Sequence, residues 1–125
     1  MALNEQEKEK WQDSLHELEL ITEGEAILDH TAGDYWWFNS QTRGNLFFME
    51  DRMIFVSGWG FERITIPYKN IRGMKKCFVG LFIPTGIKLT VFDDEKLKDK
   101  TYKFSVLKRK NWMEYLSNKS GVTPM

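Results

Sequence analysis

Three short apolar runs in the middle of the chain restrict its fold more than any other feature. The runs are Leu46–Met49, Met53–Val56 and Arg63–Ile66. A polar break at Glu50–Arg52 separates the first two runs, and a glycine-flanked break separates the last two. Runs of about four to six residues are too short for helices, and Phe, Ile, Val and Thr favour extended backbone. The stretch 44–71 therefore predicts a three-stranded antiparallel meander.

The first two runs are apolar at every position, so both faces of these strands need cover. Successive side chains of a strand point to opposite faces, and only one face can fill the core. Residues 4–21 predict an amphipathic helix that could cover the other face, with Asn4 as its N-cap and Gly24 at its end. The apolar stripe of this helix consists of Trp11, Leu15, Leu18 and, at its start, Leu3.

Further strands are expected on both sides of the meander. Gly33 and Asp34 could form a bulge or a turn between the first two of them. The residues 93–100 read as a charged hairpin connection. The expected strands are Ala26–His30, Tyr35–Phe38, Arg72–Val79, Ile87–Phe92 and Thr101–Val106.

A helix is expected at the end of the chain. Ser105 could cap it, and it would run to about Lys119 before Gly121 and Pro124. Its apolar face would contain Trp112, Met113 and Leu116, with Tyr115 at the margin. The order of helix, about seven strands and helix indicates a closed or nearly closed antiparallel sheet with a helix at one opening.

Five segments in this order resemble the GRAM domain of the pleckstrin-homology-like superfold. They are GEAILDH, GNLFFMEDRMIFVS, ITIPYKNIRGMKK, GIKLTVFDD and TYKFSVLKRKNWMEYL, and the resemblance covers roughly residues 24–117. The chain departs from the family pattern at Met49–Asp51. The resemblance implies a mainly β fold with α: a partly open seven-stranded antiparallel barrel capped by a C-terminal helix. We expect an N-terminal helix over 1–23, the domain over 24–119 and a tail over 120–125.

The resemblance also implies a function, because such domains are adaptors that bind membrane lipids or proteins and are not enzymes. We expect a GRAM-type module that mediates protein–protein interaction or self-association. The alternative is peripheral membrane lipid binding through basic and aromatic loops. With zero net charge over the whole chain, nucleic acid is not an expected partner.

Catalysis and metal binding have little support in the sequence. The two histidines are His16 and His30, and a dyad of Cys77 with His30 is conceivable, but a lone Cys in a strand is usually a small core hydrophobe. Residues 93–95 could hold a hard cation, but a charged hairpin beside lysines is the simpler interpretation. We therefore expect no catalytic residue, metal or cofactor.

Charge is divided unevenly along the chain. Residues 1–62 contain 4 Lys/Arg and 13 Asp/Glu, a net −9, and residues 63–125 contain 14 and 5, a net +9. The division predicts an acidic-on-basic contact within the chain or in a dimer, or an exposed basic face. We favour contact with the acidic first helix. Candidate anion contacts are Lys75, Lys76, Lys108, Arg109 and Lys110, with Lys88 and Lys103 nearby.

The segment Cys77–Gly86 is unusually apolar for a connection. Either the strands extend further and the side chains point into the barrel mouth, or the loop presents them to a partner or membrane. Leu81 and Phe82 cannot both point inward with their neighbour, so we expect at least one to be exposed. The candidate partner or membrane contacts are Phe78, Leu81, Phe82, Tyr35 and Trp36.

The expected location is the cytoplasm, with peripheral association at a membrane as a possibility for the lipid-binding alternative. The single cysteine excludes an intramolecular disulfide framework. The chain starts without an apolar leader segment, and no apolar run approaches the roughly 18 residues of a membrane span.

Overall fold

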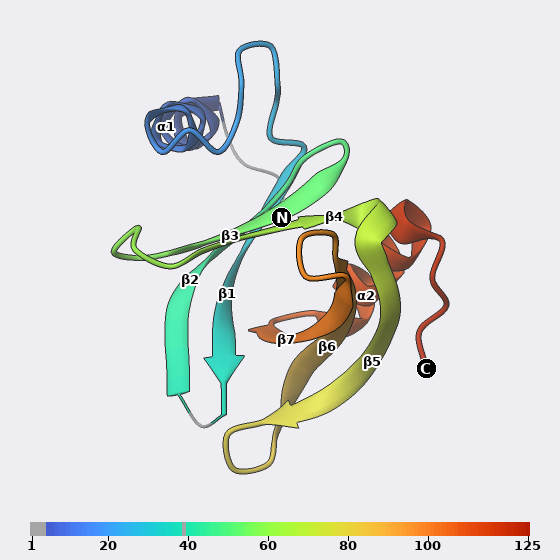
Figure 1. The fold of residues 1–125 in the computed structure, drawn as a ribbon. Coiled ribbons are helices and arrows are strands. Elements are labelled where there is room, and N and C mark those ends of the chain that lie inside the picture. Colours follow the sequence, from blue (N-terminus) through green and yellow to red (C-terminus); the bar gives the residue numbers. More distant parts are fainter. Residues whose placement is uncertain (1–4, 39) are drawn as a thin grey trace.

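The computed structural model describes residues 5–38 and 40–125, which form seven strands and two α-helices (Figure 1). Neighbouring strands are antiparallel, in the order β4-β3-β2-β1-β7-β6-β5. The elements are α1 Glu5–Glu17, β1 Asp29–Trp37, β2 Ser40–Phe48, β3 Arg52–Ser57, β4 Arg63–Pro67, the 3-10 helix η1 Tyr68–Asn70, β5 Ile71–Val79, β6 Ile83–Asp93, β7 Lys98–Val106 and α2 Arg109–Ser120.

The sheet bends into a partly open barrel, as the sequence predicts. Strands β2, β3 and β4 are the expected meander, with Phe47 opposite Ile54 and Ile54 opposite Thr65. Strands β4 and β5 stand at the two ends of the strand order, so the barrel stays open between them. The 3-10 helix η1 connects these two edges at the point where Pro67 ends β4.

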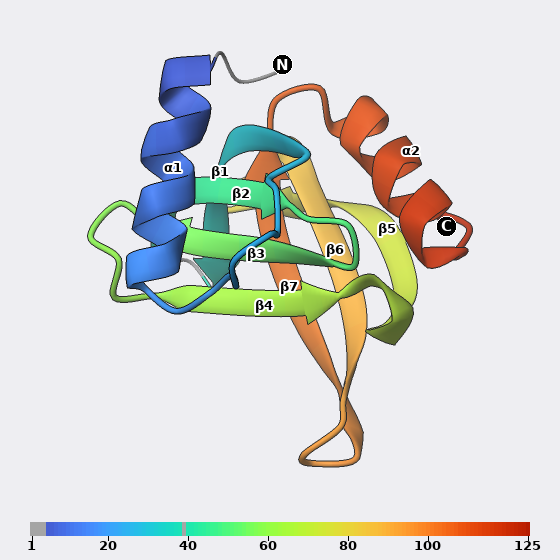
Figure 2. The same ribbon diagram turned by 90° about the horizontal axis from the view of Figure 1, so that it is seen from above.

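Helix α2 lies at one opening of the barrel and completes its interior core (Figures 1 and 2). Its side chains Trp112, Met113 and Leu116 are buried, as expected. The indole of Trp112 stacks on the ring of Phe48, with centroids 4.5 Å apart and planes 6° apart. Gly121 ends the helix with φ 77°, a left-handed conformation that favours glycine.

Helix α1 covers the outer face of the β2–β3 pair (Figure 2). Its buried Leu15 packs in a second apolar cluster with Phe47 and Ile54, whose strand neighbours point into the barrel instead. The ring of Trp11 lies 5.2 Å from that of Phe47, and Leu18 packs against the same cluster. The expected cover for the second apolar face is therefore confirmed.

Helix α1 is shorter than predicted. It ends at Glu17, and the chain turns away at Glu19, where φ is 59°. Gly24 therefore lies in the connection to β1, where Ile21 and Ile27 add to the outer cluster. The predicted N-cap and the first residue of the stripe, Asn4 and Leu3, lie outside the described residues.

Three further local predictions are wrong. Strand β1 begins at Asp29 rather than at Ala26, and it continues through Gly33 without a bulge or a turn. The glycine at this position allows β7 to approach closely, because a Cβ on Gly33 would lie 3.0 Å from Val106 Cγ1. Ser105 does not cap α2, which begins at Arg109, because Ser105 is part of β7.

Replacing Trp112 by Ala should destabilise the barrel. The substitution removes a buried aromatic ring and its stacking contact with the ring of Phe48. We expect the free energy of unfolding to fall by about 3–5 kcal/mol, measured by urea denaturation. An unchanged denaturation midpoint would contradict the placement of Trp112 in the core.

An ion pair fastens the connection between α1 and β1 to the sheet. The guanidinium of Arg52, at the start of β3, contacts both carboxylate oxygens of Glu25 at 2.6 and 2.9 Å. It also donates to the carbonyl oxygen of Leu20 at 2.9 Å. The hydrogen bonds from Arg52, together with one from the backbone N–H of Thr22, lower the pKa of the Glu25 carboxyl from 4.5 to about 2. The ionised carboxylate therefore stabilises the folded state.

The stability of the Glu25→Gln variant should depend less on pH than that of the unmodified protein. A lowered folded-state pKa stabilises the fold above the unfolded value of 4.5, and this stability is lost as pH falls toward about 2. Near neutral pH we expect the variant to be about 1–2 kcal/mol less stable, a value limited by partial solvent exposure. Urea denaturation of both proteins across this acid range should show the difference shrinking. An equal difference at every pH would contradict the prediction.

Candidate functional site

The end of the β5–β6 hairpin presents three large apolar side chains to solvent, one from β5 and two from the turn. Phe78 is 61%, Leu81 84% and Phe82 80% exposed. Phe78 and Phe82 lie edge to face with ring centroids 6.4 Å apart. The prediction that at least one of Leu81 and Phe82 is exposed is confirmed. We call Phe78, Leu81 and Phe82 the apolar tip.

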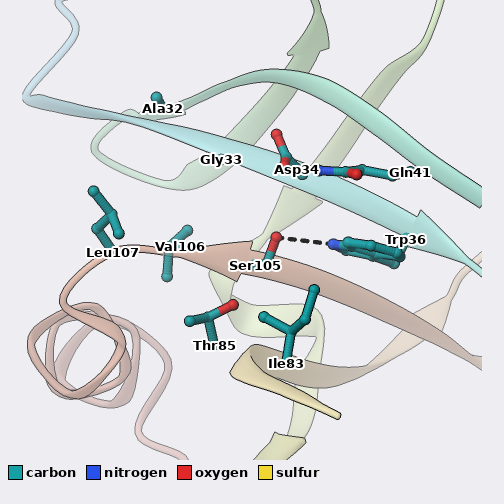
Figure 3. A pocket seen from close by; sticks show the side chains of 10 residues that line it. All are labelled: Ala32, Gly33, Asp34, Trp36, Gln41, Ile83, Thr85, Ser105, Val106 and Leu107. Carbon is teal, nitrogen blue, oxygen red and sulfur yellow. Dashed lines mark hydrogen bonds between the residues drawn. The ribbon is translucent and has the colours of Figure 1, made fainter. Parts of the chain in front are cut away.

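Trp36 supports the apolar tip from below. Gly80, at φ 57°, lies against the indole, and a Cβ on this glycine would be 3.2 Å from the ring. The indole Nε1 donates a hydrogen bond to Ser105 Oγ at 2.8 Å, as Figure 3 shows. Trp36 is only 8% exposed. Trp36 was expected to be a partner or membrane contact, but it supports the turn from beneath and is not part of the exposed surface.

A shallow pocket of about 300 Å³ lies beside this indole (Figure 3). Its polar groups include the Ser105 hydroxyl and the Asp34 carboxylate, which accepts a hydrogen bond from the Gln41 amide. Apolar side chains, among them Ile83 and Leu107, complete the wall. Of the residues that line the pocket, none is a histidine or cysteine, and the one carboxylate, that of Asp34, is engaged by the Gln41 amide.

The four consecutive aromatics of the first hairpin separate as strand alternation requires. Tyr35 points into the barrel, where its ring packs near Phe55 and Phe104, so it lies apart from the apolar tip. Trp37 and Phe38 are 63% and 82% exposed at the end of the hairpin. The β1–β2 and β5–β6 hairpins both end at the lower side of the molecule in Figure 1.

Two exposed aromatics on the β3–β4 connection were missing from the predicted contacts. Trp59 is 87% and Phe61 90% exposed. Both flank Gly60. The sequence had been interpreted here only as a break between two strands. The signal was available, because a large aromatic beside a turn glycine has no alternating strand neighbours to bury it.

The basic candidates form two groups. Lys108 and Lys110 are exposed at the start of α2, and Arg109 between them donates to the carbonyl oxygens of Cys77 and Gly86, both at 3.3 Å. The other group lies on the sheet: Lys75 and Lys76 are exposed on β5, next to Lys88 on β6 and Lys103 on β7.

The favoured contact between the acidic first helix and this basic surface is absent from the described residues. Helix α1 lies on the β2–β3 face, away from α2 and β5 (Figure 2). The ion pairs found in residues 5–38 and 40–125 join Arg52 to Glu25 and Asp51, and Arg72 to Asp99. The physical reason is the apolar stripe, which places the helix where the sheet needs cover, irrespective of charge.

The possible catalytic residues have structural roles. His30 lies in the α1 interface, where Nε2 is 2.8 Å from Asn45 Oδ1 and the ring stacks on Trp11. Burial raises the pKa of the Cys77 thiol, which disfavours the reactive thiolate. Contacts found for His30 among the described residues do not include Cys77.

The acidic residues 93–95 form the expected charged hairpin connection. The Asp93 carboxylate accepts hydrogen bonds from the backbone N–H groups of Glu95 and Lys96, and these bonds lower its pKa. The Asp94 carboxylate accepts a bond from the Asn70 amide at 2.9 Å. Within the described part of the chain, no group of three or more His, Cys, Asp or Glu residues could hold a metal ion. None of its helices is long and apolar enough to cross a membrane.

Comparison with solved structures places this architecture in the pleckstrin-homology-like class. The C-terminal domain of an unknown protein from Leishmania infantum matches with a TM-score of 0.69 and 18% identity over 90% of this chain and 95% of that one. The DH/PH domains of p115-RhoGEF match with a TM-score of 0.66 and 8% identity. Those of PDZ-RhoGEF, crystallised in complex with GTP-gamma-S activated RhoA, match with 0.62 and 7%.

These similarities define the fold alone. The match with p115-RhoGEF spans 93% of this chain but only 40% of the p115-RhoGEF chain. The match with PDZ-RhoGEF spans 78% of this chain but 30% of the PDZ-RhoGEF chain. No family model matches the sequence, and no curated protein matches it. The pleckstrin-homology-like fold expected from the GRAM resemblance is confirmed.

Replacing Gly80 by Ala should strain the apolar tip. The residue has φ 57°, where a side chain is unfavourable, and the new Cβ would press on the Trp36 ring. We expect a loss of about 1–2 kcal/mol in the free energy of unfolding, together with a change in indole fluorescence. Gly60→Ala is a matched control, because Gly60 has φ 76° but no atom near its Cβ position. Equal behaviour of the two variants would show that Trp36 does not support the turn.

Proposed function

We propose that this chain is a GRAM-type binding module without catalytic activity, and that it contacts a protein partner, including a second copy of itself, through the apolar tip. One observation carries the proposal: Phe78, Leu81 and Phe82 are exposed on a turn that the protein holds in place. Exposed apolar patches on an ordered surface are typical of interaction sites. The structural similarity to DH/PH chains is consistent with a binding module. We also propose that the protein is located in the cytoplasm.

The support beneath the tip distinguishes it from a loosely exposed loop. Gly80 packs on Trp36, and the Trp36 indole is hydrogen-bonded to Ser105. A surface that is ordered before binding loses less conformational entropy when the partner arrives. The tip can therefore contribute its apolar area without first having to fold.

Peripheral membrane binding is the second candidate. It is favoured by the lysines that flank the tip on the two strands of the same hairpin, Lys75 and Lys76 on β5 and Lys88 on β6. Apolar side chains at the acyl boundary with lysines at the headgroups are the usual combination for anionic membranes. Vesicle co-sedimentation separates the candidates, because only this one requires binding to anionic vesicles that weakens with salt.

The double substitution Leu81→Ser and Phe82→Ser tests the role of the tip. Both side chains are more than three-quarters exposed, so we expect the stability to change by less than about 0.5 kcal/mol. Self-association measured by sedimentation velocity should weaken. A matched control is Phe61→Ser with Leu97→Ser, which removes the same residue types, 90% and 75% exposed, from other turns. Unfolding of the tip variant, or equal weakening by the control, would contradict the proposal.

A further inference from the structure

Three lysines stand side by side on the outer face of the second half of the sheet. Lys75 on β5 is directly opposite Lys88 on β6, and Lys88 is directly opposite Lys103 on β7. Their strand neighbours, such as Leu89 and Phe104, are buried in the barrel, so the lysines point outward. We call Lys75, Lys88 and Lys103 the lysine row.

No acidic residue lies within two positions of the lysine row on its own three strands. The outward residues two positions along each strand are uncharged: Gly73, Cys77, Thr90, Gly86, Thr101 and Ser105. On the adjacent strand β1, Asp34 is opposite Ser105 and therefore shares the outer face diagonally from Lys103, but its carboxylate accepts a hydrogen bond from Gln41. No ion pair among the described residues includes a member of the row. Like charges on directly opposed strand positions are destabilising, so the isolated chain carries an unfavourable arrangement here.

Helix α1 carries the opposite arrangement. Glu9, Asp13 and Glu17 follow one another at intervals of four residues, all are exposed, and no ion pair of the described chain includes them. Like charges four residues apart on a helix repel each other. At 100° per residue this stripe lies opposite the side that carries Leu15, which faces the barrel. We call Glu9, Asp13 and Glu17 the acidic stripe.

The cations of α1 do not neutralise the acidic stripe. The ammonium group of Lys10 lies over the Trp11 ring, 5.9 Å from its centroid. Lys8 is half-buried and, at 100° per residue, lies near the side of Leu15. The stripe therefore remains a negative surface directed away from the barrel.

The two surfaces match in spacing but cannot meet within one chain. Residues four apart on a helix are about 6 Å apart along its axis, and neighbouring strands are about 4.8 Å apart. A helix crossing β5, β6 and β7 along the row would thus place three carboxylates near three ammonium groups. In the folded chain, α1 is held on β2 and β3 by its apolar side (Figure 2).

We propose that the lysine row binds the acidic stripe on α1 of a second copy of this chain. The contact joins two different surfaces, so each copy keeps one free row and one free stripe. Such head-to-tail contacts form rings or open chains rather than simple twofold dimers. The contact relieves the repulsion within both surfaces at once. It uses residues other than the apolar tip, so it is independent of the function proposed above.

Charge reversal with cross-rescue tests the proposal. In one variant Glu9, Asp13 and Glu17 are each changed to Lys, and in the other Lys75, Lys88 and Lys103 are each changed to Glu. The unmodified protein should self-associate in sedimentation velocity at low salt, and raising sodium chloride from about 50 to about 500 mM should weaken this. Each variant alone should associate about tenfold more weakly. Their mixture should recover association, because the basic stripe of one fits the acidic row of the other.

A control pair separates this contact from attraction between oppositely charged proteins. Reversal of Glu50, Glu95 and Glu114 to Lys, and of Lys69, Lys96 and Lys98 to Glu, gives variants with the same net charges of +6 and −6 starting from 0. All six positions are exposed and lie outside the row and the stripe. Each control variant should associate like the unmodified protein, so that mixing the two control variants restores nothing. Control variants that lose association as strongly as the test variants, and regain it equally on mixing, would overturn the proposal.

Further outcomes are equally decisive. The change of all three row lysines to Gln removes their repulsion, so this variant should be folded, at least as thermally stable as the unmodified protein, and deficient in association.

An unmodified protein that is monomeric at low salt at every concentration overturns the proposal. If that monomer instead binds phosphatidylserine vesicles and the Gln variant does not, the row faces a membrane. Loss of association in the apolar-tip variant with normal behaviour of the row variants would support the tip and overturn the row.

Discussion

Burial of β2 and β3 on both faces is the constraint on which the rest of the structure depends. Leu46 and Phe55 fill the barrel, while Phe47 and Ile54 face the other way and are equally buried. A strand pair of this kind must be covered twice. The bent sheet with α2 supplies one cover and α1 supplies the other. The position of α1, and with it the separation of acidic and basic surfaces, follows from this requirement rather than from charge.

Patterns of short range predicted most of the fold. Strand alternation and the apolar stripe of α1 are properties of neighbouring residues, and both predictions were confirmed. Ser105 was misread because a serine before a helical segment resembles a cap, although the expected strand Thr101–Val106 contains it; its pairing with Gly86 and Asp34 places it in β7. Gly33 was misread as a break because its close contact with Val106 is also a tertiary effect.

The candidate surface was predicted less completely than the fold. The unusual apolar content of the β5–β6 turn was visible in the sequence, and alternation predicted that at least one of Leu81 and Phe82 would be exposed. The sequence could not say that Trp36 would be covered by that same turn, since this depends on how the hairpin bends across β7. The lysine row depends on strand register across three strands, which composition and net charge do not contain.

The two separate apolar clusters have a consequence for local opening. The interior cluster holds Phe48, Phe104 and Trp112, and the outer cluster around Leu15 shares β2 and β3 with it but none of its buried side chains. Helix α1 can therefore detach while the barrel interior remains packed. Its amide protons should exchange with solvent through this partial opening, whereas those of β3 require the whole barrel to unfold. The helix is thus a cooperative unit of its own, and anything that binds its outer side also slows its exchange.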